Sequence, residues 1–266
     1  MLKLPHLDRV RRVARLAEQP AAWAHYLVGR RRKRVAAAAG PAPVFDPGTI
    51  AGLRLWLRGD DISASDGSPV SAWADASGYG NSVGQATGMK MPTFQAAQLN
   101  GHSYLAFDGV DDTLFKPSAS GFACTTGHTV IAVLNPTTAV AYGMAVVTNY
   151  QGNEMRQTGS GGTPQWMIPS GFYQVDGLNN VSGSWKVWSG TFSVGTGDLE
   201  LFINGASQGT ENDGSALAVG DIYLGSRTDT YHWLGDMAEV LVFDDVLGAG
   251  ERGNVESYLM AKYALT

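Results

Sequence analysis

From Leu53 onward, apolar residues recur at every second position, which is the period of a β-strand with one buried face. Runs of this kind occupy residues 53–57, 103–107, 129–134, 145–148, 185–194, 199–203, 221–224 and 237–243. The pair Asn204-Gly205 follows one of them and favours a two-residue hairpin, because both residues accept a positive φ. Many short strands joined by close turns predict an all-β chain that folds as a two-sheet antiparallel β-sandwich.

The period changes to that of a helix at both ends of the chain. Near the C-terminus, Val255, Leu259 and Tyr263 recur at i, i+4 and i+8, which predicts a helix over residues 250–265. In the first 28 residues, apolar positions recur at helical spacing on both sides of a helix-breaking proline, and they predict a short helical arm. A linker of Ala, Gly and Pro follows. We therefore expect two parts, an arm and linker over residues 1–43 and a sandwich domain over residues 44–266.

Charge is distributed unevenly between these two parts. Residues 1–40 contain ten Lys and Arg side chains and two acidic ones, a charge of +8, so the formal net charge of -5 leaves -13 for the rest of the chain. A basic tail beside an acidic body is typical of a segment that docks on an acidic partner. The 34 glycines and the low charged fraction of 16% agree with a sheet-rich domain with many turns.

Neither a disulfide nor a membrane segment is expected. Cys124 is the only cysteine, so it cannot form an internal disulfide. After Met1, Arg and Asp interrupt the apolar residues every two or three positions, so we expect no secretory signal peptide. No stretch approaches the roughly 20 apolar residues that span a bilayer, and we expect no membrane partner.

Several segments of the sandwich resemble a known family. They are LRLWLRGDD at residues 53–61, VSAWADASG at 70–78, FDGVDD at 107–112, WKVWSGT at 185–191, LELFING at 199–205, YLGS at 223–226 and GDMAEVLVFDDVL at 235–247, followed by a terminal helix. In this order they resemble the laminin-G-like, concanavalin-type jelly rolls of bacteria and phages, over most of residues 53–266. The resemblance implies a two-sheet sandwich whose concave face and loops bind glycans or proteins, sometimes with calcium.

Catalytic patterns are weak in this sequence. Glycosidases use two carboxylates that flank the scissile bond, and the nearest candidates are Asp198 with Glu200 and Asp236 with Glu239. The first pair lies beside a hairpin turn, where solvated charges are ordinary, and the second is expected on opposite strand faces. The histidines lack zinc-ligand spacing, and no serine lies in a nucleophile-elbow context. We expect a protein that is not an enzyme.

Acidic residues gather at strand ends. Asp108, Asp111 and Asp112 offer oxygen ligands of the kind that calcium prefers. The alternative is that these side chains support the turn through hydrogen bonds to nearby backbone groups. Calcium is the one cofactor that the sequence suggests.

Four rings are candidates for stacking on a sugar. Trp166, Tyr173, Tyr231 and His232 lie among Gly, Pro and Thr residues, which predicts loops. The alternative is that these rings anchor the loops against the sandwich.

The arm offers anchoring residues of two kinds. Leu7, Val10 and Trp23 are its apolar contacts, and Arg30, Arg31, Arg32, Lys33 and Arg34 form a basic run. Such a run could bind nucleic acid, remain solvated, or dock on an acidic protein surface. We favour docking on a protein and expect no nucleic-acid partner.

Together these features favour a bacteriophage virion protein. The arm would anchor on capsid, neck or tail proteins after assembly in the host cytoplasm, and the sandwich would be displayed in several copies. Repeated copies, as in a homo-oligomer, convert weak binding of host glycans into avidity. One alternative is a bacterial glycan-binding or glycan-processing protein exported by another route, and a second is a nucleic-acid-binding protein that acts through the basic arm.

Overall fold

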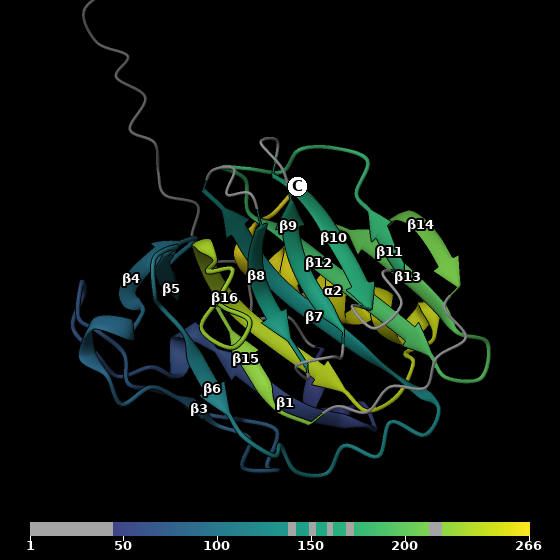
Figure 1. The fold of residues 1–266 in the computed structure, drawn as a ribbon, viewed down its shortest axis with the longest axis horizontal. Helices are drawn as coiled ribbons and strands as arrows, with labels where there is room; N and C mark the ends of the chain where they lie inside the picture. The colour runs from purple at the N-terminus through teal and green to yellow at the C-terminus, as the bar shows by residue number, and fades with distance from the viewer. Residues whose placement is uncertain (1–44, 138–141, 149–152, 159–161, 169–172, 213–219) are drawn as a thin grey trace, which may run out of the picture. The chain divides into compact units, whose positions relative to one another are not determined.

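The computed structural model describes residues 45–137, 142–148, 153–158, 162–168, 173–212 and 220–266 (Figure 1). The arm lies outside these described residues, and with it the candidate anchors Leu7, Val10, Trp23 and residues 30–34. The domain boundary predicted near Val44 is therefore still a prediction.

The described residues form two antiparallel sheets. The first has the strand order β14-β13-β12-β7-β16-β5-β4, and β1 pairs with β16 beside β5. Its strands are β1 (Leu53–Arg58), β4 (Thr93–Leu99), β5 (His102–Asp108), β7 (Gly127–Pro136), β12 (Lys186–Ser193), β13 (Asp198–Ile203), β14 (Ala206–Asn212) and β16 (Leu234–Phe243).

The second sheet has the order β11-β10-β9-β8-β15-β6-β3-β2. Its strands are β2 (Ala72–Trp73), β3 (Val83–Gly84), β6 (Leu114–Lys116), β8 (Tyr142–Val147), β9 (Glu154–Thr158), β10 (Thr163–Ile168), β11 (Tyr173–Asp176) and β15 (Ile222–Leu224). Three short 3-10 turns, Pro47–Thr49, Gly59–Asp61 and Gly88–Lys90, and one helix, α2 (Ala249–Tyr263), complete the described part. The predicted two-sheet antiparallel β-sandwich with a C-terminal helix is confirmed.

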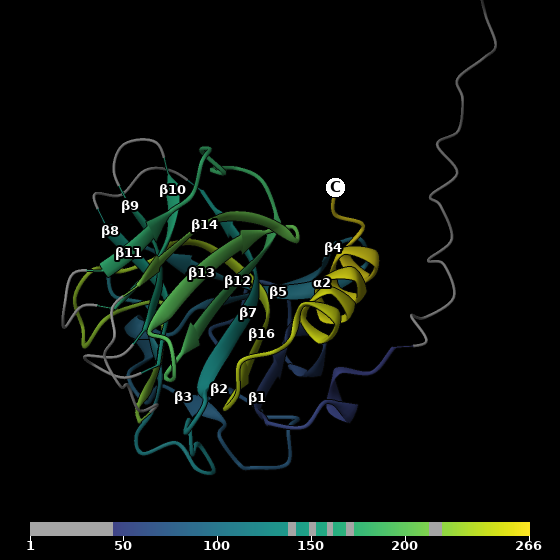
Figure 2. The same ribbon diagram turned by 90° about the vertical axis from the view of Figure 1, so that its right-hand side faces the viewer.

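Apolar side chains fill two layers. The larger layer lies between the sheets, and the smaller one lies between the first sheet and α2, which covers the outer face of that sheet (Figure 2). Val255, Leu259 and Tyr263 of the helix are at most 1% exposed, as their spacing predicts. Burying three large side chains stabilises the docked helix by several kcal/mol, at roughly 1.5–3 kcal/mol each.

Strand β1 differs from the predicted strand with a single apolar face. Its pairing with β16 shifts register between Leu53 and Leu55, so Leu53 packs in the helix-side layer and Leu55 between the sheets. Trp56, which alternation places on the polar face, is 7% exposed and also packs beneath the helix. Both faces of this strand are therefore buried.

The hairpin predicted at Asn204-Gly205 is confirmed. The φ angles of these residues are 49° and 79°, and the flanking residues Ile203 and Ala206 are paired. Two positive φ values are the geometry of a tight hairpin turn that matches the twist of its strands. Within the described residues, the one helix is too short and too polar to cross a membrane.

Candidate functional site

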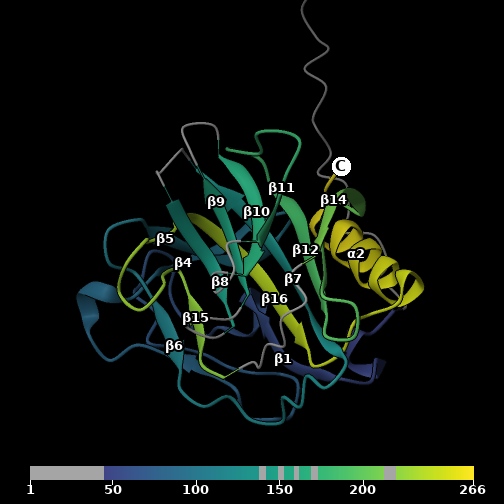
Figure 3. The same cartoon turned by 45° about the vertical axis from the view of Figure 1, so that its right-hand side comes forward.

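A pocket of about 480 Å³ opens on the outer face of the second sheet. Its walls come from β8, β9, β10 and β11, seen side by side in Figure 3, and from the loop between β15 and β16. The lining residues are Tyr142, Met144, Arg156, Met167, Gln174, Arg227 and Tyr231.

Strand alternation explains why these side chains share one face. Met155, Trp166 and Val175 are paired across β9, β10 and β11, and all three belong to the core between the sheets. Successive side chains point to opposite faces of a sheet, so their neighbours Arg156 and Gln174 point outward. The polar wall of the pocket therefore lies on the outer face of the second sheet, opposite to the face that packs in the core.

The fully buried carboxylate of Glu154 pairs with two arginines of the pocket wall. Glu154 is 0% exposed, and its Oε1 is 2.9 Å from Nε of Arg227, while its Oε2 is 3.5 Å from Nη1 of Arg156. Burial raises the pKa of Glu154, and the two guanidinium groups act in the opposite direction. The ion pairs join β9 to a loop more than 70 residues away in the sequence.

Amide side chains hold the guanidinium of Arg156 in place. Its Nε donates to Oε1 of Gln165 at 2.8 Å, and its Nη2 donates to Oε1 of Gln174 at 3.3 Å. Both glutamines in turn donate to Asp176. Fixed rotamers lower the entropic cost of binding, so this wall is preorganised.

Two exposed tyrosines stand at the pocket. Tyr142 and Tyr231 are 47% and 50% exposed, and their ring centroids are 6.0 Å apart in an edge-to-face arrangement. The guanidinium of Arg156 lies 5.3 Å from the ring centroid of Tyr142. Exposed rings beside fixed polar groups are the usual composition of a small-ligand site.

The loop that carries Arg227 and Tyr231 has an unusual backbone. Thr228, Asp229 and Tyr231 have φ angles of 48°, 67° and 57°, a region that non-glycine residues rarely adopt. Arg227 and Thr230 exchange two backbone hydrogen bonds of 2.8 and 3.0 Å, and the N–H of Met144 donates to the carbonyl of Tyr231 at 3.0 Å. Such conformations persist only where surrounding contacts hold them, and they cluster at functional sites.

The four predicted stacking rings have different outcomes. The loop assignment of Trp166 is wrong, because this residue lies in β10, is 0% exposed, and donates from Nε1 to the carbonyl of Thr191 at 2.9 Å. Tyr173 is also in a strand, β11, and alternation places it on the face of Val175, opposite to Gln174. Tyr231 is in a loop and lines the pocket.

His232 follows Tyr231 but is not among the residues that line the pocket. It lies near Asp112, whose pKa burial raises to about 6 while the N–H of Asp108 and the nearby His232 act in the opposite direction. His232 therefore belongs to the surroundings of the acidic loop.

The three predicted calcium ligands do converge. One carboxylate oxygen from each of Asp108, Asp111 and Asp112 lies within 4.8 Å of the others. Two of these groups accept backbone hydrogen bonds: Oδ1 of Asp108 from Val110 at 2.8 Å, and Oδ2 of Asp112 from Asp108 at 2.9 Å. Calcium needs six to eight oxygens, so the trio fits a turn and supplies only part of a coordination shell. Calcium binding remains a prediction.

The two candidate carboxylate pairs are engaged in structural contacts. Asp198 accepts a hydrogen bond from Asn212 at 2.8 Å, and Glu200 accepts one from Ser207 at 2.8 Å. In the second pair, Asp236 accepts a hydrogen bond from Asn135 at 2.9 Å.

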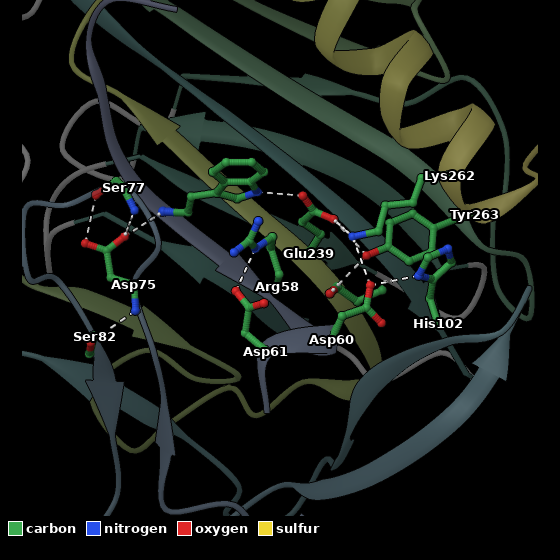
Figure 4. A network of polar contacts seen from close by, with 12 residues as sticks. Arg58, Asp60, Asp61, Asp75, Ser77, Ser82, His102, Glu239, Lys262 and Tyr263 are labelled. Atoms are coloured by element: carbon green, nitrogen blue, oxygen red, sulfur yellow. Dashed lines mark hydrogen bonds and ion pairs between the residues drawn. The ribbon is translucent and has the colours of Figure 1, made fainter. Parts of the chain in front are cut away.

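The expectation that Asp236 and Glu239 lie on opposite faces is wrong, because the register shift between Met237 and Glu239 pairs them with Asn135 and Val133, which share one face of β7. This shift leaves Glu239 beneath α2, where it accepts hydrogen bonds from Trp56 at 2.6 Å, Lys262 at 2.7 Å and Tyr263 at 2.8 Å (Figure 4). Its carboxylate is 0% exposed, so a polysaccharide has no access to it.

The sequence interpretation missed Glu154, Arg156 and Arg227. In the segment Glu154–Thr158, the charged residues Glu154 and Arg156 stand two positions apart, so in a strand they point to the same face. This spacing was the available signal. Nothing local connects them to Arg227, because the contact depends on the pairing of β15 with β8.

The described residues thus form a two-sheet antiparallel β-sandwich with an open pocket on the outer face of one sheet, and the class of protein is a β-sandwich domain. A sequence model of the laminin-G type within the concanavalin A-like lectin/glucanases superfamily matches residues 101–251, more than half of the chain. The chain therefore belongs to this family. No match is found among curated proteins.

Solved structures share the fold at low identity. The binding domain of botulinum neurotoxin serotype D has a TM-score of 0.58 at 12% identity, over 79% of this chain and 51% of that chain. The binding domain of botulinum neurotoxin DC in complex with SialylT has a TM-score of 0.54 at 13% identity, over 78% and 51%. A Trypanosoma rangeli sialidase in complex with the inhibitor DANA has a TM-score of 0.50 at 15% identity, over 82% and 35%. The chain thus spans about half of each toxin domain and about a third of the sialidase chain.

Proposed function

We propose that this domain is a non-catalytic glycan-binding module and that the pocket between Tyr142 and Tyr231 is its binding site. The observation that carries the proposal is the joint presence of two half-exposed rings and a fixed polar wall. Rings provide a flat apolar surface for the C–H face of a sugar, and guanidinium and amide groups donate to its hydroxyls. The family and the complex of a structural neighbour with SialylT support a glycan as the ligand class.

The composition of the pocket supports binding without hydrolysis. Glycosidases place two carboxyl groups on either side of the bond that they cleave. None of the described residues that line this pocket is Asp or Glu, and Glu154 is fully buried and paired with two arginines. We therefore expect no release of reducing sugar from polysaccharides by the purified protein.

Replacement of Tyr231 tests the site. Tyr231→Ala should weaken binding to a glycan array by up to about tenfold, because an aromatic contact contributes about 0.5–1.5 kcal/mol beyond the area that it buries. The matched control is Tyr79→Ala, since Tyr79 is 44% exposed and lies outside the pocket. Equal binding by the two variants would show that the pocket is not the site.

We propose further that residues 1–43 attach this module to a phage particle in many copies. The support is the charge of +8 on residues 1–40 against -13 on the remainder. The expected result is that the full chain copurifies with intact particles and that replacement of residues 30–34 by serine weakens this association. Free protein that never sediments with particles would favour an exported bacterial module, and a steep salt dependence of DNA binding would favour the nucleic-acid alternative.

A further inference from the structure

The cationic and anionic side chains at the pocket differ in their exposure to solvent. The side chains of Arg156 and Arg227 are 11% and 21% exposed and line the wall, whereas the carboxylate of Glu154 is 0% exposed. The cations therefore line the wall and are the groups that a ligand would contact, whereas the anions Glu154 and Asp176 are not among the lining residues.

The other charges near the pocket are compensated or displaced from its wall. Asp229 pairs with Lys90 at 2.6 Å, outside the lining residues. Asp176, an exposed residue at the end of β11, is connected to Arg156 through the amides of Gln165 and Gln174. Among the described lining residues, the charged groups are therefore both guanidinium groups.

We infer that the pocket selects acidic glycans, with Arg227 and Arg156 receiving a carboxylate or sulfate group while Tyr142 and Tyr231 contact the sugar ring. This inference rests on the proposed function and names the ligand class for the same site. A guanidinium group matches the two oxygens of a carboxylate or sulfate with parallel N–H donors, and charge-assisted bonds are about twice as strong as neutral ones. A neutral sugar would use the tyrosines but would not form these charge-assisted bonds.

Glu154 sets the net charge that the ligand meets. Burial disfavours the ionised form of Glu154 and raises its pKa, while the two guanidinium groups favour that form. Glu154→Gln would keep one oxygen acceptor, for Arg227, would turn an NH2 donor toward Arg156, and would remove the negative charge beneath the wall. The charge model therefore predicts opposite effects for two neighbours: Arg227→Gln weakens acidic-glycan binding, and Glu154→Gln preserves or strengthens it.

The experiment uses the full chain and paired ligands on a glycan array: sialyllactose with lactose, sulfated lactose with lactose, and trigalacturonate with its methyl ester. The basic arm itself attracts polyanions, so every variant carries the same arm and only differences between variants are interpreted. Arg58→Gln is the control arginine, because Arg58 lies on β1 and pairs with Asp61 away from the pocket. Melting temperatures verify that each variant is folded.

The expected result is about tenfold weaker binding of the acidic members by Arg227→Gln, the loss of one charge-assisted hydrogen bond. Binding of the neutral members should be unchanged, and Glu154→Gln should retain or exceed wild-type affinity for acidic members. The sialyl, sulfated and galacturonate arms distinguish carboxylate from sulfate recognition.

Two results would overturn the inference and leave the proposed function intact. One is equal binding of each acidic ligand and its neutral partner, and the other is an equal loss of both in Arg227→Gln, each with Tyr231→Ala still defective. If wild-type protein binds no ligand on the array, or if Tyr231→Ala binds like wild type, the proposed function itself fails and the inference fails with it.

Discussion

Two glutamates, one in each sheet, are 0% exposed and are treated differently by the fold. Glu239 in β16 lies beneath α2 and accepts hydrogen bonds from an indole, an ammonium group and a phenol. Glu154 in β9 lies beneath a pocket and pairs with two guanidinium groups that reach solvent. One network is covered by a helix, and the other is open.

The covered network joins the helix to the sheet, whereas the open network lies at the wall of the pocket. The contacts of Glu239 join β1, β16 and the last turn of α2, and Lys262 extends them to Asp60 at 3.1 Å (Figure 4). They use up the polar groups of all partners, so this network fixes the helix to the sheet. The contacts of Glu154 engage Nη1 of Arg156 and Nε of Arg227, and both of these arginines line the pocket. Under the proposed function, this carboxylate orients groups for a ligand.

The largest predicted effect is in the covered network. Glu239→Ala should lower the free energy of unfolding by about 3–5 kcal/mol, because it leaves Lys262 buried without its main partner. Glu154→Ala should cost less, about 1–3 kcal/mol, since Arg156 keeps its hydrogen bonds to Gln165 and Gln174. Urea denaturation of both variants measures this ratio, and similar losses would remove the distinction between the two networks.

A third buried titratable group, His128, has no hydrogen-bond partner among the described residues that would offset the cost of burying it. Its ring lies 5.9 Å from those of Trp166 and Phe192, and among the described residues neither ring nitrogen has a hydrogen-bond partner. Burial lowers its pKa to about 4 from an ordinary 6.5, so the unfolded chain binds a proton first as the pH falls. Stability should therefore decrease by about 3 kcal/mol between pH 7 and pH 4, at about 1.4 kcal/mol for each unit of pKa.

His128→Leu isolates this effect. The variant should lose the part of the acid dependence between pH 6.5 and pH 4 that His128 contributes, whereas the contributions of the carboxylates are common to both proteins. Chemical denaturation at pH 7.5, 6 and 5 gives the difference. Parallel curves for the variant and the wild type would mean that the imidazole takes up its proton at the same pH in the folded and the unfolded chain.

Sequence reasoning reached the fold because its signals are local. Leu55, Leu57 and the helix residues Val255 and Leu259 follow periods that can be read within ten residues. Trp166 was misplaced because Gly, Pro and Thr near it suggested a loop, although it packs between the sheets on β10. The pocket was missed because Glu154 and Arg227 meet only through sheet pairing, which no local period encodes.

A smaller effect is expected at the hairpin that adjoins the helix. Gly205 has a φ of 79°, and a Cβ there would lie 3.2 Å from Oε2 of Glu256, a buried residue of α2. Gly205→Val should destabilise the domain by about 1 kcal/mol or more, since a β-branched side chain resists this backbone conformation. The melting temperature measures it, and Gly67→Val is the control for φ alone, because its φ is 75° and a Cβ there meets nothing within 4 Å. A smaller loss at Gly205 than at Gly67 would show that the contact with Glu256 is harmless.

The smallest effect on stability should come from the largest deletion. Both glutamate networks, His128 and both apolar layers are built from residues 45–266, so removal of residues 1–43 leaves all of the contacts described above in place. The truncated protein should therefore unfold cooperatively at the wild-type temperature and keep the pocket's glycan binding, yet fail to join a particle.

Replacement of residues 30–34 by serine in the full chain should weaken incorporation mainly at low salt, because surface charges are screened within about 10 Å at 0.1 M salt. Loss of the apolar contacts of Leu7, Val10 and Trp23 should weaken it with less dependence on salt. A truncated domain that assembles at full occupancy would assign attachment to the sandwich, and one that cannot fold alone would make the arm part of the same folding unit.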